Sequence, residues 1–158
     1  MPSRIVFRTG GAELLPLLRP LWERLRDYTR DLDGKFSPLF ARATFTGRSA
    51  ELLKKSGRGR RLSVTLALAG KVPAGYCVAT VDASGTAEID SLFVEKAYRN
   101  GGTGEKLLKR GLRWIRAQKH DRVIISVAIG NERVLDFYRR AGFEPYTYVL
   151  RPLPKGRP

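Results

Sequence analysis

The chain has 158 residues, of which 42% are hydrophobic and 28% charged, as expected for one globular domain rather than a disordered or low-complexity chain. It contains one cysteine, Cys77, and one histidine, His120, which excludes an internal disulfide and a zinc site made of these residue types. Lys and Arg number 30 against 15 Asp and Glu, so the net charge of +15 favours an anionic partner: a phosphorylated cofactor, a nucleic acid or an acidic protein surface.

Apolar runs along the chain are short. None approaches the ~18 consecutive apolar residues of a membrane-spanning helix, and the N-terminus lacks the apolar core of a secretory signal. We therefore expect a cytoplasmic protein with no membrane partner.

The first 60 residues predict one strand and two helices. A short strand is expected at residues 4–8, and apolar residues at helical spacing predict a helix over residues 12–30. Pro16 and Pro20 lie near the beginning of that helix, where they can split off a first turn. After a turn-rich connection, a second helix is expected at residues 49–55, with Ser49 as its N-cap.

The rest of the chain predicts a meander of strands followed by alternating helices and strands. Strands are expected at residues 61–68, 75–81 and 87–94, a helix at 103–119, a strand at 123–129, a helix at 131–140 and a last strand at 146–150. This order predicts an α/β fold of the α+β type: a mixed, mostly antiparallel sheet flanked by helices, in a single domain over residues 1–158.

A glycine-rich loop follows the strand at residues 87–94 and opens the next helix. Backbone N–H groups at a helix N-terminus, together with the helix dipole, form an anion site, and glycines at Gly102 and Gly104 let phosphates approach these groups. A Walker A loop is excluded because Glu105 separates Gly104 from Lys106, and a dinucleotide fingerprint is excluded because it would require glycine at Leu107.

What remains is the pattern Arg-x-x-Gly-x-Gly, formed by Arg99, Gly102 and Gly104. In this context it resembles the acyl-CoA-binding motif of the GCN5-related N-acetyltransferase (GNAT) superfamily. The segment that begins at Asn131 and contains Phe137, Tyr138 and Gly142-Phe143 is similar to the second signature of that family. The resemblance covers about residues 60–150, and it implies that residues 1–59 are variable helices on the acceptor side.

The resemblance implies a V-shaped splay between the fourth and fifth strands and a set of cofactor-binding residues. Main-chain groups near Phe93 and Val94 would orient the thioester, and Asn131 would contact the pantetheine arm, although an Asn at a helix start is equally suited to be an N-cap. The pyrophosphate would lie on the loop formed by Arg99, Asn100, Gly101, Gly102, Thr103 and Gly104.

Two catalytic residues are implied in the same way. Tyr138 matches the tyrosine that protonates the departing thiolate, which a phenol with a pKa of about 10 can do at neutral pH. Glu88 lies 14 residues ahead of Gly102, at the offset of the glutamate base in the histone-acetylating branch. Asp90 lies on the same strand face by the period of two, and either carboxylate can take the proton or hold a cationic substrate.

The leading hypothesis is therefore an acetyl-CoA-dependent N-acetyltransferase, without a metal, that acetylates the primary amine of a small molecule or a protein. The alternative is a non-catalytic module that senses acyl-CoA or binds nucleic acid through its basic surface, including the five basic residues between Lys54 and Arg61. A homodimer is expected only because dimers are common in the family that the chain resembles.

Overall fold

The computed structural model describes residues 3–32 and 34–155. Their contacts divide into two compact units, each of which is described by itself. Unit 1 comprises the residues up to Glu23 together with Thr44–Ser126, and unit 2 comprises Arg24–Ala43 together with the residues from Val127 onward. The expectation of a single domain over residues 1–158 stays a prediction.

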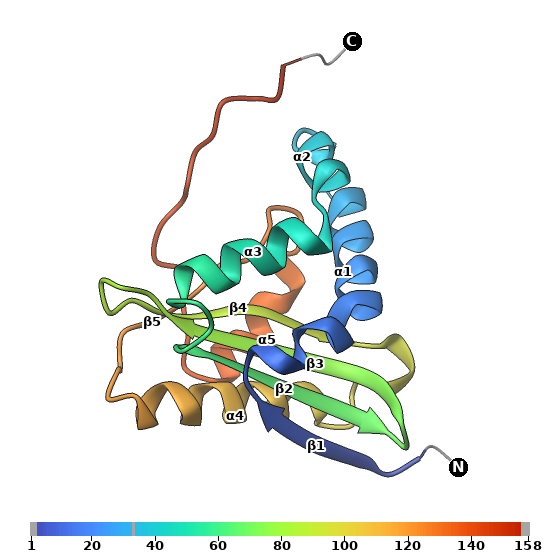
Figure 1. The fold of residues 1–158 in the computed structure, drawn as a ribbon. Helices are drawn as coiled ribbons and strands as arrows, with labels where there is room; N and C mark the ends of the chain where they lie inside the picture. The colour runs from blue at the N-terminus through green and yellow to red at the C-terminus, as the bar shows by residue number, and fades with distance from the viewer. Residues whose placement is uncertain (1–2, 33, 156–158) are drawn as a thin grey trace. The chain divides into compact units, whose positions relative to one another are not determined.

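The sheet of unit 1 has five strands in the order of the sequence: β1 (Ile5–Gly10), β2 (Leu62–Ala69), β3 (Val72–Val81), β4 (Ala87–Val94) and β5 (Val123–Ile125). The first four are antiparallel, and β4 pairs with β5 in parallel. The predicted mixed and mostly antiparallel sheet, flanked by helices, is confirmed (Figure 1).

Helices of both kinds accompany the sheet. The α-helices are α1 (Arg19–Leu32), α2 (Ser37–Arg42), α3 (Phe45–Lys55), α4 (Thr103–Ala117) and α5 (Leu135–Arg140). Short 3-10 helices are η1 (Ala12–Leu18), η2 (Lys96–Tyr98) and η3 (Glu132–Val134). Of these, η1, α3, η2 and α4 belong to unit 1, whereas α2, η3 and α5 belong to unit 2.

Helices α3 and α4 cover opposite faces of the sheet in unit 1 (Figure 1). Alternate residues of β3 point to opposite faces, so Cys77 and Ala79 face one helix while Thr80 faces the other. Gly111 of α4 lies so close to the sheet that a Cβ there would be 2.9 Å from Cys77 Sγ and 3.0 Å from Ile89 Cδ1. A residue without a side chain is therefore what lets α4 approach the strands.

The pairing of β4 with β5 is short. It joins Ala87, Glu88 and Ile89 to Val123, Ile124 and Ile125, and then stops. Beyond Ile89, β4 continues to Val94 without a strand paired on that edge among the residues that the structure describes. This is the opening that a splay between the fourth and fifth strands requires.

The N-terminal helices differ from the prediction in detail. The helix expected at residues 12–30 is divided into η1 and α1, with Pro20 in the first turn of α1, where its missing N–H costs least. The second helix begins earlier than expected, because Thr44 is its N-cap and accepts a hydrogen bond from the Gly47 N–H (3.1 Å). Ser49 therefore lies inside α3, and the N-cap prediction was wrong.

The structure contains less strand after residue 122 than the sequence predicts. The strand expected at residues 123–129 ends at Ile125, because the chain turns where the Asn131 N–H donates to the Ala128 carbonyl and Gly130 takes a φ of 91°. The strand expected at residues 146–150 is wrong: this segment has no regular structure, and its apolar side chains are exposed, Tyr146 to 97% and Leu150 to 90%. A strand that buries neither face gains little over coil.

Within the described residues, no helix has the length and apolar character needed to cross a membrane.

Candidate active site

The predicted anion site is formed where β4 leads through η2 into α4. Gly102 is the residue before the first turn of α4 and has a φ of 78°, a left-handed conformation that glycine adopts without strain. A Cβ at Gly101 or Gly102 would meet no other atom within 4 Å, so the loop is open on the side of these glycines. The first N–H groups of α4, which no helical carbonyl can reach, are thus accessible to an anion.

Arg99 adds positive charge to this loop. Its Nε donates to the carbonyl of Val94 at 2.8 Å, and its guanidinium lies 5.6 Å from the centre of the Phe93 ring. Both contacts fix the guanidinium at the end of β4, next to the glycine loop. The sequence predicts that Arg99 belongs to the cofactor site, and this role stays a prediction.

The register of β4 determines which main-chain N–H groups its open edge presents. The Glu95 N–H donates to the Ala74 carbonyl on the β3 side (2.8 Å), and alternate residues of an antiparallel strand point to the same neighbour. The N–H of Phe93 therefore points toward β3, whereas those of Leu92 and Val94 point away from it. Of the two predicted thioester contacts, Val94 presents its N–H on the open edge of β4, whereas Phe93 does not. Leu92, which was not predicted, presents its N–H on the same edge as Val94.

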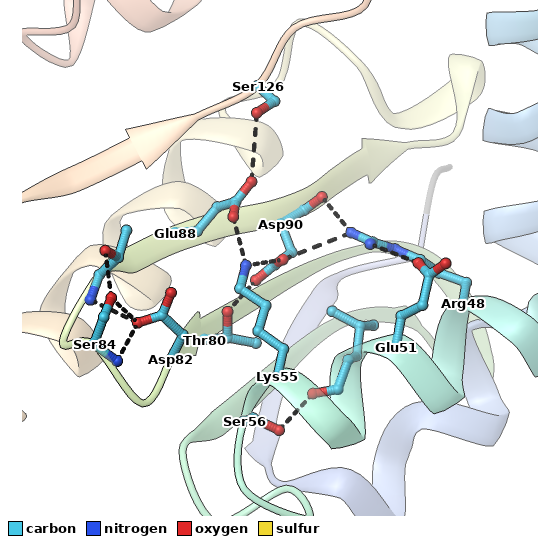
Figure 2. A network of polar contacts seen from close by, with 12 residues as sticks. Arg48, Glu51, Lys55, Ser56, Thr80, Asp82, Ser84, Glu88, Asp90 and Ser126 are labelled. Carbon is cyan, nitrogen blue, oxygen red and sulfur yellow. Dashed lines mark hydrogen bonds and ion pairs between the residues drawn. The ribbon is translucent and has the colours of Figure 1, made fainter.

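The face of β4 toward α3 carries a network of partly buried charges, which Figure 2 shows from close by. Lys55 extends from the C-terminal end of α3, and its Nζ lies 2.5 Å from Glu88 Oε2 and 2.7 Å from Asp90 Oδ1. Arg48, two turns earlier on the same face of α3, donates to the Asp90 carbonyl at 3.2 Å. Two carboxylates of β4 thus meet two cations of α3.

Asp90 is the irregular residue of β4. In the pairing with β3, Val78 is opposite Ser91 and Ala79 is opposite Ile89, so Asp90 has no partner and forms a β-bulge. Its side chain is only 2% exposed, and its second oxygen accepts a hydrogen bond from Thr80 Oγ1 at 2.5 Å. Both carboxylate oxygens are therefore engaged, which suits a structural residue better than a proton acceptor.

Glu88 is better placed for chemistry than Asp90. Its side chain is 18% exposed, and only Oε2 is in close contact with Lys55. The other oxygen, Oε1, lies 3.5 Å from the Ser126 hydroxyl, a long hydrogen bond that a stronger donor can replace. Glu88 thus keeps one oxygen for a ligand.

The charge of Lys55 is determined by two opposing effects. Burial alone lowers the pKa of its ammonium group, but the hydrogen bonds to Asp90 and Glu88 outweigh this effect and raise the pKa above the ordinary lysine value. Lys55 is therefore charged throughout the physiological range.

The second predicted motif lies in unit 2. Asn131 is at the N-cap position of η3 but makes no side-chain cap; instead, its Oδ1 accepts a hydrogen bond from the Tyr28 hydroxyl at 3.3 Å. Arg133 also donates to that hydroxyl and lies over the Tyr28 ring. The capping alternative for Asn131 is thereby excluded, and its role toward a cofactor stays a prediction.

Tyr138 lies in α5, also in unit 2. Its half-buried ring packs edge to face against Phe137, with ring centres 5.1 Å apart. Gly142, with a φ of 89°, follows the helix end as predicted, and its N–H donates to the Arg139 carbonyl. The structure gives Tyr138 a fixed place on the helix of the second motif, and its catalytic role stays a prediction.

Two further features bear on the chemistry. Burial raises the pKa of the Cys77 thiol to about 12, so the group stays protonated and is a poor nucleophile. Within the described residues, no group of three or more His, Cys, Asp or Glu side chains is arranged to hold a metal.

Basic side chains cover exposed surfaces of unit 1. They line the outer face of α4, and the loop after α3 carries a second group; the exposed members are Lys54, Arg58, Arg60, Lys106, Lys109, Arg110, Arg113 and Arg116. Arg110 lies over the Phe7 ring of β1, 4.8 Å from its centre. A partner for these surfaces stays a prediction.

Comparisons with known proteins give the family. A model of the acetyltransferase (GNAT) family matches residues 21–143. Among solved structures, an aminoglycoside N-acetyltransferase in complex with CoA is 18% identical and has a TM-score of 0.70, covering 99% of this chain and 98% of its own. A GCN5-related N-acetyltransferase from Ralstonia eutropha JMP134 is 17% identical and has a TM-score of 0.73, covering 95% and 99%.

A curated relative is more similar over a shorter segment. An uncharacterized N-acetyltransferase from Methanocaldococcus jannaschii is 30% identical over 69 residues, which are 42% of this chain and 30% of that protein. The chain thus matches less than a third of the length of this relative. Together with the family model, these results show that the chain belongs to the acetyltransferase (GNAT) family, a class of acetyl-CoA-dependent acetyltransferases.

The residues at the end of β4 fit coenzyme A. The open space beside Gly101 and Gly102 suits the pyrophosphate, and Arg99 supplies positive charge beside it. The main-chain edge at Leu92 and Val94 offers hydrogen bonds to the amide-containing pantetheine arm. The loop predicted from the sequence and the unpaired edge therefore form one continuous candidate site in unit 1.

Sequence reasoning missed the cations of the network. Arg48, Leu52 and Lys55 follow one another at helical spacing, and Leu52 is buried, so one face of α3 presents two basic residues around an apolar one. On β4, the carboxylates of Glu88 and Asp90, two residues apart, form a pattern that complements the two cations of α3. What the sequence could not supply is the contact between the two elements.

Replacing glycines of the loop tests the anion site. In the double variant Gly102→Val/Gly104→Val, side chains fill the space in front of the N–H groups, so saturating coenzyme A should no longer raise the melting temperature; the parent should gain about 2.7 kcal/mol at 100 times Kd. Gly70→Val is the matched control, because Gly70 also has a positive φ of 62° and open space around it. An unchanged shift in the double variant would contradict the site.

The Lys55 network should stabilise the fold in a definite pH range. Because the pKa of Lys55 is raised in the folded protein, its stabilisation is complete below the ordinary lysine pKa of about 10.4 and is lost as the pH rises through the higher folded value. Lys55→Met should lower the free energy of unfolding by about 2 kcal/mol, which is less than the loss of a fully buried ion pair. The difference in unfolding free energy between parent and variant should shrink only above about pH 10.5. Urea unfolding between pH 7 and 11 measures this difference. Lys54→Met is the control, because Lys54 is the exposed lysine next to Lys55.

Proposed function

We propose that this chain transfers the acetyl group of acetyl-CoA to a primary amine by direct attack, without an acetylated enzyme. The observation that carries the proposal is the construction of β4, which presents an open main-chain edge next to the Arg99–Gly104 loop and carries Glu88 on one face. Bound acetyl-CoA supplies the thioester, and the residues of β4 hold the groups around it.

The first task of the chain is to orient the thioester. The N–H of Val94 or Leu92 would donate to the thioester carbonyl and stabilise the negative charge that develops on its oxygen during attack. Because these donors belong to a strand, they are fixed before the reaction and need little reorganisation. Arg99, held by the Val94 carbonyl, couples this edge to the phosphate loop.

Its second task is to remove a proton from the acceptor. An ammonium must lose a proton before it can attack, and a carboxylate can receive it directly or through water. Glu88 is the proposed acceptor of that proton because its Oε1 is held only by the long contact to Ser126. Asp90 is not proposed for this role, since Lys55 and Thr80 engage both its oxygens.

The third task is to protonate the leaving thiolate. Tyr138 is the proposed donor, by its place in the second motif and the ordinary pKa of a phenol. The protonated Cys77 offers no competing covalent route. Among similar structures, an aminoglycoside N-acetyltransferase is in complex with the bisubstrate analogue CoA-S-monomethyl-acetylneamine, which supports a small molecule bearing an amine as the acceptor class.

A panel of primary amines tests the proposal. Thiol release from acetyl-CoA should depend on the amine, and mass spectrometry should find the acetylated amine in equal amount. Thiol release at the same rate with and without every amine would mean hydrolysis. No transfer to any amine, with coenzyme A bound, would contradict the proposed function.

Tyr138→Phe separates binding from proton donation. The variant keeps the ring packing against Phe137 and removes only the hydroxyl, so kcat should fall by about 10²-fold while the coenzyme A-induced thermal shift is unchanged. Tyr148→Phe is the matched control, because Tyr148 is exposed. Full turnover in Tyr138→Phe would reduce this tyrosine to a packing residue.

A further inference from the structure

The Lys55 ammonium lies where a ligand ammonium would bind. Two carboxylate oxygens, one each from Glu88 and Asp90, lie at 2.5 Å and 2.7 Å from Nζ, and charged hydrogen bonds of this length are the strong contacts that a primary ammonium seeks (Figure 2). In an enzyme that takes amines, such a carboxylate pair would attract cations from solution. Here the chain fills it with its own side chain.

The charges of this network are balanced but unevenly exposed. Glu88 and Asp90 are 18% and 2% exposed, whereas Lys55 and Arg48 are 25% and 29% exposed. Of these four groups the two cations are therefore the more exposed, while Glu51, the acid that pairs with Arg48, is 72% exposed. Asp90 is already paired with two cations through Oδ1, Lys55 at 2.7 Å and Arg48 at 3.6 Å, and Thr80 donates to its other oxygen.

The surroundings strengthen this asymmetry. A shallow depression beside the network is lined by Glu51, Lys54, Lys55, Asp82, Ala83 and Ser84. Both acids of this lining have partners: Glu51 pairs with Arg48 at 3.4 Å, and Asp82 accepts hydrogen bonds from Ser84 and Thr86. The exposed cations of the following loop, Arg58 and Arg60, add to the positive field of a chain with net charge +15.

We propose that Lys55 is a specificity-determining residue: it excludes polycationic acceptors and selects a small amine that carries a neighbouring anionic group, a carboxylate or a phosphate. This inference rests on the proposed function, because that function requires Glu88 to face the acceptor amine. The acceptor's amine meets Glu88 through Oε1, and its anionic group lies against the partly exposed side chains of Lys55 and Arg48.

Matched acceptors test the charge preference. Glycine against glycinamide probes a carboxylate, O-phosphoethanolamine against ethanolamine probes a phosphate, and spermidine represents polycations. With the parent, kcat/KM should be about tenfold or more higher for the anionic member of at least one pair, and lowest for spermidine. The pair that shows the preference identifies the anionic group.

Variants assign the preference to Lys55. Lys55→Gln should remove the preference and raise kcat/KM for spermidine by about tenfold, because it frees a carboxylate pair for a ligand cation. Lys55→Arg should keep the preference by keeping the charge. Lys71→Gln is the matched control, since it removes the same charge from an exposed lysine in the turn between β2 and β3 and should leave the ratio unchanged.

Each adverse result has a separate meaning. Equal or better acetylation of glycinamide, ethanolamine and spermidine by the parent would overturn the inference while leaving the proposed function intact. A parallel loss for every acceptor in Lys55→Gln would make Lys55 merely structural and overturn it too. Absence of product with every amine would contradict the proposed function.

A binding experiment decides the inference without turnover. In Lys55→Ala, propylammonium chloride should raise the melting temperature above the value in sodium chloride of equal ionic strength, because it refills the carboxylate pair. The parent and Lys54→Ala should show no such difference. If Lys55→Ala also shows none, the pair is not an ammonium site and the inference fails.

Discussion

The structure depends on the way in which one irregular residue of β4 is held. Asp90 interrupts the pairing with β3, and a bulge of this kind bends a strand and disturbs its ladder. Lys55, Arg48 and Thr80 bind its carboxylate and its carbonyl, so the irregularity is fixed from both α3 and β3. A buried carboxylate without these partners would be strongly destabilising.

This constraint brings both halves of the proposed chemistry to one strand. Before the bulge, β4 pairs with β5; after it, the edge toward β5 is open and Val94 leads into the phosphate loop. Glu88, immediately before the bulge, is held by the same lysine that holds Asp90. The cofactor edge, the proposed base and the proposed specificity residue therefore all lie on or against one strand.

The sequence predicted local features better than distant contacts. The strands of the meander and the helix after the glycine loop follow from local periodicity, and the family was predicted from the resemblance of two short motifs to its signatures. The strand expected at residues 146–150 fails because strand formation depends on a partner and a buried face, which an apolar alternation cannot report. Lys55 and Arg48 were missed because an ion pair between residues more than 30 positions apart is a property of the fold.

The most direct measurement is a crystal structure of the protein with acetyl-CoA. The account predicts the pyrophosphate on the N–H groups around Gly102 and Gly104, and the thioester carbonyl within about 3 Å of the N–H of Val94 or Leu92. It also predicts that Lys55 stays on Glu88 and Asp90 while Asp90 remains bulged. A cofactor bound away from the open edge of β4, or an ordered cofactor with its thioester remote from both N–H groups, would contradict the account.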